Sequence, residues 1–382
     1  MGFEDTTLKN KKFPRAVVAV VSTWAILLAM RFVAPIASGQ EVDSARTISK
    51  IAFGSCARER REQPVWKDIL ATEPDLFLMI GDNQYADFWP KDGKMGMRPV
   101  PNIERIQEAY RELGRKPGFV DLRKQCLLMA TWDDHDYGAN DYGKEFPLRK
   151  ESQREFIKFF GFPNDHPIHQ QEGIYHSRTF GESGKRVQVV MLDTRYHRDQ
   201  LERAENRRGG GPYTGTKDSS KTVLGDAQWK WLEKQLKQPA DVRIIASSIQ
   251  VVADEHGWET WGNFPHERSR LYKLIEQTKA NGAIIVSGDR HLIEISCDDQ
   301  RGAAYPIWDF TSSGLTQNQE PVEETNQYRI GPVKREQNFG QIQIEWRMPV
   351  ENTRIHLEGI GAGGKALTRQ TVFLGSLQTN DD

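Results

Sequence analysis

The chain has 382 residues, enough for one large α/β domain or two average domains. With 52 basic and 53 acidic residues its formal net charge is −1, so it has no global positive field and we expect no specific nucleic-acid binding. Its three cysteines are too few and too scattered to form a disulfide framework.

The first 39 residues have the pattern of a secretory signal peptide. Four basic residues between positions 9 and 15 precede the apolar run 16–30, and small residues follow at 37–39. We therefore expect export to the periplasm or the extracellular space. The alternative is an uncleaved membrane anchor with the rest of the chain outside, although Arg31 and Pro35 interrupt the apolar stretch.

A β-α-β unit begins the folded part of the chain. A strand, a helix with apolar residues at helical spacing and a second strand are predicted at 48–53, 63–71 and 76–80. A cysteine, Cys56, follows the first strand, and Asp82 and Tyr85 follow the second. This arrangement predicts a parallel sheet with polar groups at one edge. We place a linker at 40–47, the domain at 48–376 and a tail at 377–382.

Residues 127–141 contain the strongest functional signal. An apolar run, predicted to be a buried strand, is followed by three acids, a histidine and an asparagine: Asp133, Asp134, Asp136, His135 and Asn140. Open α/β sheets place their chemistry at the carboxyl ends of strands. Carboxylates this close repel one another, and a cation relieves that repulsion. The structural alternative is an acidic loop with Asx-turns and a helix N-cap.

Helices and strands alternate through the rest of the chain. Further helices are predicted at 103–113, 151–160, 224–236 and 267–280. Further strands are predicted at 173–180, 186–192, 242–247, 283–287, 292–297, 305–311, 340–347, 354–359 and 370–374. Residues 87–101 are expected to form a surface excursion near the site, and 198–222 a long polar loop.

Two of these later strands also end in candidate site residues. Asp193 and Arg195 follow the strand at 186–192, and Asp289 and His291 follow 283–287. Arg195 can contact a phosphate oxygen or form an ion pair with Asp193. Because an unpaired buried charge costs several kcal/mol, a core has no use for so many charges at one sheet edge.

The ligand types narrow the chemistry of such a site. Carboxylates, an amide oxygen and a tyrosine suit hard cations such as Ca²⁺, Mg²⁺ or Fe³⁺. One cysteine and one histidine make iron or zinc plausible at a second position. Two adjacent metals can stabilise both the attacking and the leaving oxygen at phosphorus, and a nearby histidine can protonate the leaving oxygen.

Five motifs resemble those of the PhoD-type alkaline phosphatases, in the calcineurin-like metallophosphoesterase superfamily. They are Phe53-Gly54-Ser55-Cys56, Gly81-Asp82 with Tyr85, Trp132-Asp133-Asp134-His135-Asp136, Leu192-Asp193-Thr194-Arg195 and Ser287-Gly288-Asp289-Arg290-His291. The resemblance runs from about residue 48 to 375. It implies a four-layer α/β/β/α sandwich that hydrolyses phosphate mono- or diesters. It also implies an iron and calcium centre, with Zn²⁺, Mn²⁺ or Mg²⁺ as alternatives.

The resemblance also implies a role for each residue on the iron side. Asp82 matches the carboxylate that bridges the metals, Cys56 and Tyr85 match iron ligands, and His291 completes that side. The family commonly has Gly-Asp-Tyr-Ile-Tyr-Glu where this chain has Gly-Asp-Asn-Gln-Tyr-Ala-Asp. Tyr85 keeps its spacing, but this departure leaves the identity of the metals open.

On the other side, Asp134 stands where the superfamily's Gly-Asn-His-Glu motif has its Asn ligand, and His135 where it has its catalytic histidine. Asp289 replaces the first histidine of a Gly-His-x-His motif. Asn140 resembles a calcium ligand of this subfamily. Asp136 departs from the family, which commonly has Glu there.

Three functions are compatible with these observations. The first is an exported phosphoesterase in which metal-activated water attacks phosphorus, with His135 and Arg195 as catalytic residues. The second is a phospholipase D-like diesterase. The third is a secreted, calcium-stabilised binding module without catalysis. All metal-dependent versions require that Asp82, Asp134 and Asp289 converge in space.

Overall fold

The computed structural model describes residues 45–91, 94–318 and 324–379, which belong to one unit spanning Ile36–Asp382. The predicted signal peptide or anchor lies outside the described residues, as does most of the predicted linker. In the part of the chain that is described, no helix has the length and apolar character needed to cross a membrane.

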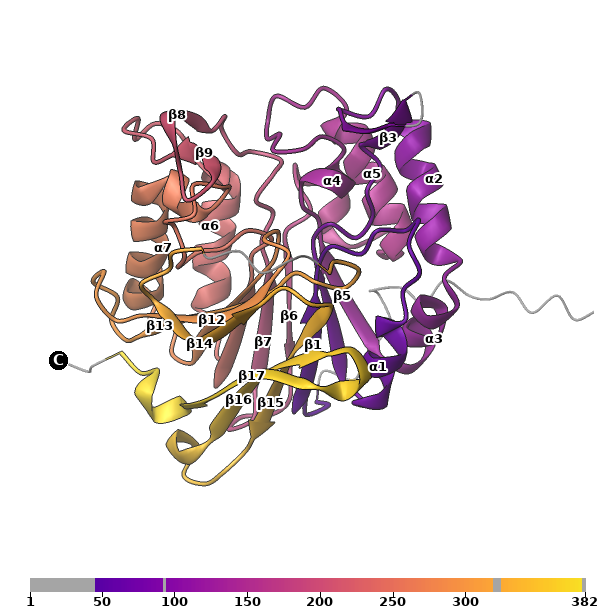
Figure 1. Ribbon diagram of the computed structural model, residues 1–382. Coiled ribbons are helices and arrows are strands. Elements are labelled where there is room, and N and C mark those ends of the chain that lie inside the picture. The colour runs from indigo at the N-terminus through magenta and orange to yellow at the C-terminus, as the bar shows by residue number, and fades with distance from the viewer. Residues whose placement is uncertain (1–44, 92–93, 319–323, 380–382) are drawn as a thin grey trace, which may run out of the picture. The chain divides into compact units, whose positions relative to one another are not determined.

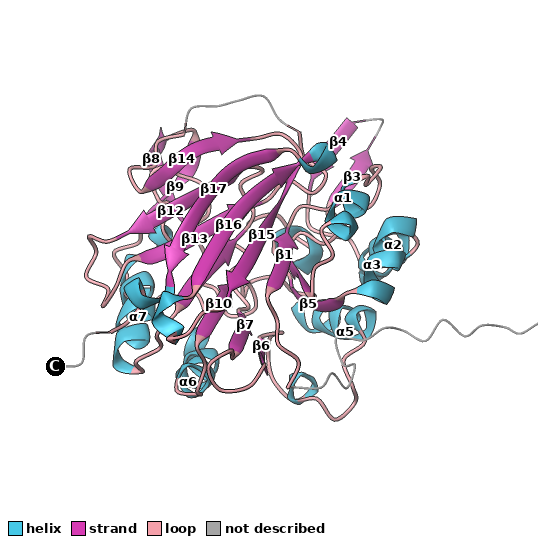
Figure 2. Cartoon of the chain, turned by 90° about the horizontal axis from the view of Figure 1, so that it is seen from below, coloured by secondary structure: helices cyan, strands magenta, loops and turns pink. Residues whose placement is uncertain are grey.

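Two mixed sheets form the centre of this unit (Figure 1). The first has the strand order β17-β16-β15-β1-β2-β5. Its parallel strands are β1 (Lys50–Gly54), β2 (Leu76–Ile80) and β5 (Leu127–Thr131). Its antiparallel strands are β15 (Asn338–Glu345), β16 (Arg354–Gly361) and β17 (Ala366–Phe373). Figure 2 shows β17, β16, β15 and β1 side by side in this order.

The second sheet has the strand order β14-β12-β13-β11-β10-β7-β6. Its parallel strands are β7 (Val187–Met191), β10 (Val242–Ala246), β11 (Ala283–Ser287) and β13 (Ile307–Ser312). Its antiparallel strands are β6 (His176–Phe180), β12 (Ile293–Asp298) and β14 (Arg329–Lys334). The strands predicted at 173–180 and 186–192 are therefore present as β6 and β7, which pair as a hairpin.

Helices cover the outer face of each sheet (Figure 1). The first sheet is covered by α1 (Val65–Ala71), α2 (Ile103–Gly114), α3 (Pro117–Gln125) and α5 (Arg149–Phe160). The second is covered by α6 (Gly225–Leu236) and α7 (Pro265–Gln277). The order helix, sheet, sheet, helix confirms the predicted four-layer α/β/β/α fold.

Strand β2 shows how the sequence builds two cores at once. Leu76, Leu78 and Ile80 belong to the apolar cluster between the sheets, whereas Phe77 and Met79 belong to the cluster beneath the helices. Successive side chains of a strand point to opposite faces, so a strand buried on both faces must be apolar throughout. This alternation explains the uninterrupted apolar run that ends at the site.

Several short elements differ from the predictions. The excursion at 87–101 contains a hairpin of β3 (Phe88–Lys91) and β4 (Lys94–Met97), and the predicted loop at 198–222 contains β8 (Glu202–Arg208) and β9 (Gly211–Thr214). Helix α3 and strand β14 were not predicted either. The β8–β9 hairpin is polar, and backbone hydrogen bonds to His256 and Gly257 hold it in place. Such bonds do not depend on an apolar pattern, so the sequence did not predict these two strands.

Candidate metal centre

The carboxyl ends of the parallel strands from both sheets meet at one place. Asp82 follows β2, Asp133 and Asp134 follow β5, and Asp289 follows β11. One oxygen from each of these four carboxylates lies within 4.8 Å of the others. The convergence that the metal-dependent hypotheses require is therefore present, although residues 82 and 289 come from different sheets.

The backbone at this junction adopts unusual conformations. Seven described non-glycine residues have positive φ, and five belong to the site: Cys56, Asp82, Asp141, Asp289 and His291. Positive φ is costly for a residue with a Cβ and persists only where surrounding structure enforces it. Gly81 shows how close the strands approach, because a Cβ there would lie 2.6 Å from Cβ of Asp133. Such strain is typical of functional sites.

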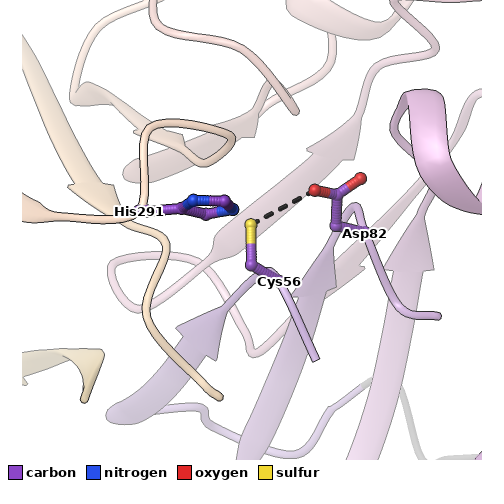
Figure 3. A group of neighbouring side chains, drawn as sticks. All are labelled: Cys56, Asp82 and His291. Atoms are coloured by element: carbon purple, nitrogen blue, oxygen red, sulfur yellow. Dashed lines mark hydrogen bonds between the residues drawn. The ribbon is translucent and has the colours of Figure 1, made fainter. Parts of the chain in front are cut away.

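Cys56, Asp82 and His291 gather on one side of the site (Figure 3), and the Tyr85 hydroxyl adds a fourth type of ligand atom there. The Cys56 thiol donates to Asp82 Oδ2 at 3.3 Å, and the Tyr85 hydroxyl donates to the same oxygen at 3.0 Å. The Tyr85 hydroxyl also lies 3.3 Å from His291 Nε2. Burial, with the charges of His135 and Arg58, lowers the pKa of His291 and keeps its imidazole neutral. A sulfur, two oxygens and a neutral nitrogen can thus bind one metal ion.

The buried carboxylates of the site differ in how well the surrounding protein stabilises their charged form. Burial raises the pKa of Asp82 and Asp289 well above the usual range, and neighbouring acids add to both shifts. For Asp134, His135 and Arg195 outweigh the effect of burial and lower the pKa to about 2. Its Oδ1 is nevertheless buried and accepts no hydrogen bond in the described residues. Clustered oxygens with an unused acceptor fit a bound cation, as do the donors of the opposite side.

His135 has one ring nitrogen fixed and the other directed toward the acids. Its Nδ1 lies 2.8 Å from Asp87 Oδ1, and its ring stacks on Tyr85 with centroids 4.2 Å apart. Its Nε2 lies 4.0 Å from Asp134 Oδ1. Burial opposes the charged form, but Asp134, Asp87 and Asp82 outweigh it and raise the pKa of His135. His135 can therefore hold a proton at the site.

A cavity of about 510 Å³ opens onto these groups. Asp134, His135, Asn140, Asp289 and His291 line its acidic end. The predicted calcium ligand Asn140 thus lies at the same cavity as the carboxylates. A small molecule that enters it would meet the candidate ligands and His135 together.

The sequence matches the family model described as PhoD-like phosphatase over residues 51–347. The chain belongs to the PhoD-like phosphatases. This membership confirms that the protein is a hydrolase of phosphate esters. It argues against the hypothesis of a binding module without catalysis.

Solved structures agree with this assignment at the level of the fold. The structure of PhoD superposes with a TM-score of 0.65 at 16% identity, covering 88% of this chain and 72% of that one. Purple acid phosphatase PPD1 from yellow lupin (Lupinus luteus) seeds gives a TM-score of 0.53 at 12% identity, covering 87% and 55%. No curated protein shows significant similarity to the sequence.

Arg195 forms buried ion pairs with two acids of the PhoD-like site. Its side chain is fully buried, and it does not belong to the described lining of the cavity. Its Nε donates to Asp133 Oδ1 and its Nη1 to Glu259 Oε2, both at 2.6 Å. Its ion-pair partner is therefore Asp133 rather than Asp193, which instead accepts backbone N–H groups including that of Ile174 at 2.8 Å.

Three acids of the PhoD-like site were not singled out from the sequence. Asp87 lies in the stretch predicted as a surface excursion, yet it is the partner of His135. Asp141 directly follows Asn140, and its N–H donates to Asp134 Oδ2 at 2.7 Å. Glu259 lies in the segment between β10 and α7, for which no site residue was predicted. The spacing from Asp82 to Asp87 within one loop was the available signal for the first of them.

Proposed function

We propose that this PhoD-like phosphatase is an exported, metal-dependent phosphoesterase that hydrolyses phosphate mono- or diesters in the 510 Å³ cavity. One observation carries the proposal: oxygens of Asp82, Asp133, Asp134 and Asp289 lie within 4.8 Å of one another beside a histidine. Buried carboxylates this close are costly unless cations share them.

Two kinds of metal position fit the donors. Cys56, Tyr85 and His291, with Asp82, would hold the softer or trivalent ion, for which Fe³⁺ is our choice. Asp134, Asp289 and Asn140 offer oxygens only and would hold Ca²⁺, with Asp82 placed between the two sets. Metal ions there would act as Lewis acids on the phosphate and lower the pKa of water.

The chain's own residues supply the proton chemistry. Asp87 accepts a hydrogen bond from Nδ1 of His135 and so leaves Nε2 as the nitrogen on the side of Asp134. His135 in its protonated form can donate from Nε2 to the leaving oxygen of the ester. The Tyr85 ring, stacked on the imidazole, limits its rotation. Arg195 contributes by holding Asp133 and Glu259 in place, so we assign it a positioning role in place of direct substrate contact.

Hydrolysis before and after chelation tests this function. We expect the protein purified without chelator to hydrolyse p-nitrophenyl phosphate or bis-p-nitrophenyl phosphate. Exhaustive chelation should abolish the activity, and added metal should restore it. Activity on both esters that survives chelation would contradict the proposal. Choline release from phosphatidylcholine is the assay that separates a phospholipase D-like activity from hydrolysis of small esters.

Export is supported by the basic and apolar pattern of residues 1–39. The full chain expressed in a bacterium should reach the periplasm, the medium or the outer side of the membrane. N-terminal sequencing would then distinguish a cleaved signal from a retained anchor. Recovery only from the cytoplasm, in folded and active form, would contradict export without affecting the catalytic proposal.

A further inference from the structure

The cavity of the proposed phosphoesterase site also has a basic end. Arg290, Arg335 and Glu324 line it, together with the indole of Trp258. The Nη2 atoms of both arginines donate to the same atom, Glu324 Oε1, each at 2.6 Å. Two guanidinium groups thus share one carboxylate oxygen.

This basic cluster is built into the protein and is not a set of surface charges. The Arg290 and Arg335 side chains are only 10% and 8% exposed. The Arg290 guanidinium lies 5.4 Å from the Trp258 ring centroid, a cation–π contact that fixes its plane. The buried Nε of Arg290 meets no acceptor in the described residues. A buried donor without a partner is costly, so an incoming oxyanion would gain a hydrogen bond there.

The two arginines also act on a neighbouring histidine. Nδ1 of His256 accepts the N–H of Trp258 at 3.0 Å. Burial, reinforced by Arg290 and Arg335, lowers the pKa of His256 well below its usual value. The lining of the cavity therefore combines acids, where metals would bind, with arginines that can attract anions.

We propose that Arg290 and Arg335 form a leaving-group subsite that selects phosphate esters whose leaving group carries a second oxyanion, such as a carboxylate or a phosphate. The inference rests on the proposed function, because the scissile phosphate would occupy the acidic end. A volume of about 510 Å³ suits one small molecule that reaches both ends. Guanidinium groups bind planar or tetrahedral oxyanions through paired N–H donors.

The test compares three aryl esters on the metal-loaded full chain: phenyl phosphate, 4-carboxyphenyl phosphate and 4-phosphonophenyl phosphate. We expect kcat/KM to be about tenfold higher or more for the two esters with a second anion, the usual effect of a hydrogen bond to a charged group. The ratio between the carboxylate and phosphonate esters identifies the preferred oxyanion. Arg335→Gln should remove the preference, and Arg335→Lys should retain part of it.

Lys334→Gln is the matched control, because it removes the same charge from the exposed neighbouring residue. It should leave the preference unchanged. Equal kcat/KM on the three esters, or a preference that Arg335→Gln does not alter, would overturn the subsite. Failure of the wild type to hydrolyse any of them would instead overturn the proposed function.

Binding provides a measurement that does not depend on turnover. Calorimetry of the metal-loaded wild type should show tighter binding of 4-carboxybenzylphosphonate than of benzylphosphonate, by about tenfold. Arg335→Lys should reduce this difference even if Arg335→Gln does not fold. Equal affinities in the wild type would overturn the inference and would assign the arginines to structural support of Glu324.

Discussion

The carboxylate of Asp87 accepts a hydrogen bond from Nδ1 of His135 at 2.8 Å, across 48 residues of sequence. Both side chains are buried, and Asp87 is one of the charges that raise the pKa of the imidazole. The pair therefore fixes the tautomer of His135 and favours its protonated form.

Asp87→Asn tests this relationship. An amide can still accept the Nδ1 proton but carries no charge, so the pKa of His135 should fall. We expect kcat to decrease about 10- to 100-fold with little change in KM, as for other residues that act through a neighbour. Because less His135 is protonated at a given pH, the alkaline limb of the pH–rate profile should move to lower pH. An unshifted profile would show that the carboxylate does not tune His135.

His135→Ala removes the proposed proton donor itself. We expect kcat to fall about 10²- to 10⁴-fold, the range for loss of a general acid. Metal content should stay near that of the wild type, since His135 is not among our proposed ligands. Metal analysis beside the kinetics checks this. Loss of metal together with activity would show that His135 is a ligand.

Tyr85→Phe removes a proposed iron ligand but keeps the aromatic ring that stacks on His135. If ferric iron binds the phenolate, the wild type should be coloured, and the variant should lose the visible band together with iron. Tyr272→Phe is the control, because it removes a buried hydroxyl on α7 that donates to Asp298, which is not a proposed ligand. An identical visible spectrum in Tyr85→Phe and wild type would contradict ligation by Tyr85.

Asp289→Asn should have opposite effects on the apo and metal-loaded proteins. Burial and Asp133 raise the pKa of Asp289, so its charged form is unfavourable when no cation is bound. Neutralising it should raise Tm after chelation. The same change removes a ligand oxygen charge, so the increase of Tm on adding metal should shrink. Thermal unfolding with and without metal measures both, and an equal shift in the two states would argue against a ligand role.

His176 should make the protein less stable as pH falls. Burial lowers its pKa to about 4, whereas an unfolded histidine titrates near 6.5. Between these values the unfolded state binds a proton that the folded state does not. Stability from this residue is therefore complete above about pH 6.5 and is lost toward pH 4, by about 3 kcal/mol in all. Denaturant unfolding of wild type and His176→Phe across this range should show a smaller loss in the variant.

Much of the sheet framework was predictable because each buried strand is an uninterrupted apolar run with an abrupt polar end. The predicted bounds of β2 agree with the structure, and those of β11 do as well. Helix α3 was not predicted, because its segment begins with Pro-Gly and has only two buried residues, Phe119 and Leu122. Its position depends on packing against α1 and α2, which sequence periodicity does not report.

The candidate ligands were predictable for the same reason, since they lie in the segments that follow the buried strands. The partners of those ligands were not. Asp87 lies in a loop without periodicity, and Glu259 and Arg335 reach the cavity from segments far along the chain. The role of Arg195 was ambiguous, because the sequence does not distinguish an arginine that forms buried ion pairs from one that binds substrate. Only the three-dimensional pairing with Asp133 and Glu259 separates them.

Strand β1, which leads into Cys56, is bordered on one side by β2 and on the other by β15, almost 300 residues further on. While a ribosome is still synthesising the chain, β15 is missing, so one edge of β1 stays unpaired until residues 338–345 emerge. Assembly of the ion-binding cluster is thus a late event in biogenesis. A nascent chain stalled before β15 should remain unable to capture metal, however long it waits.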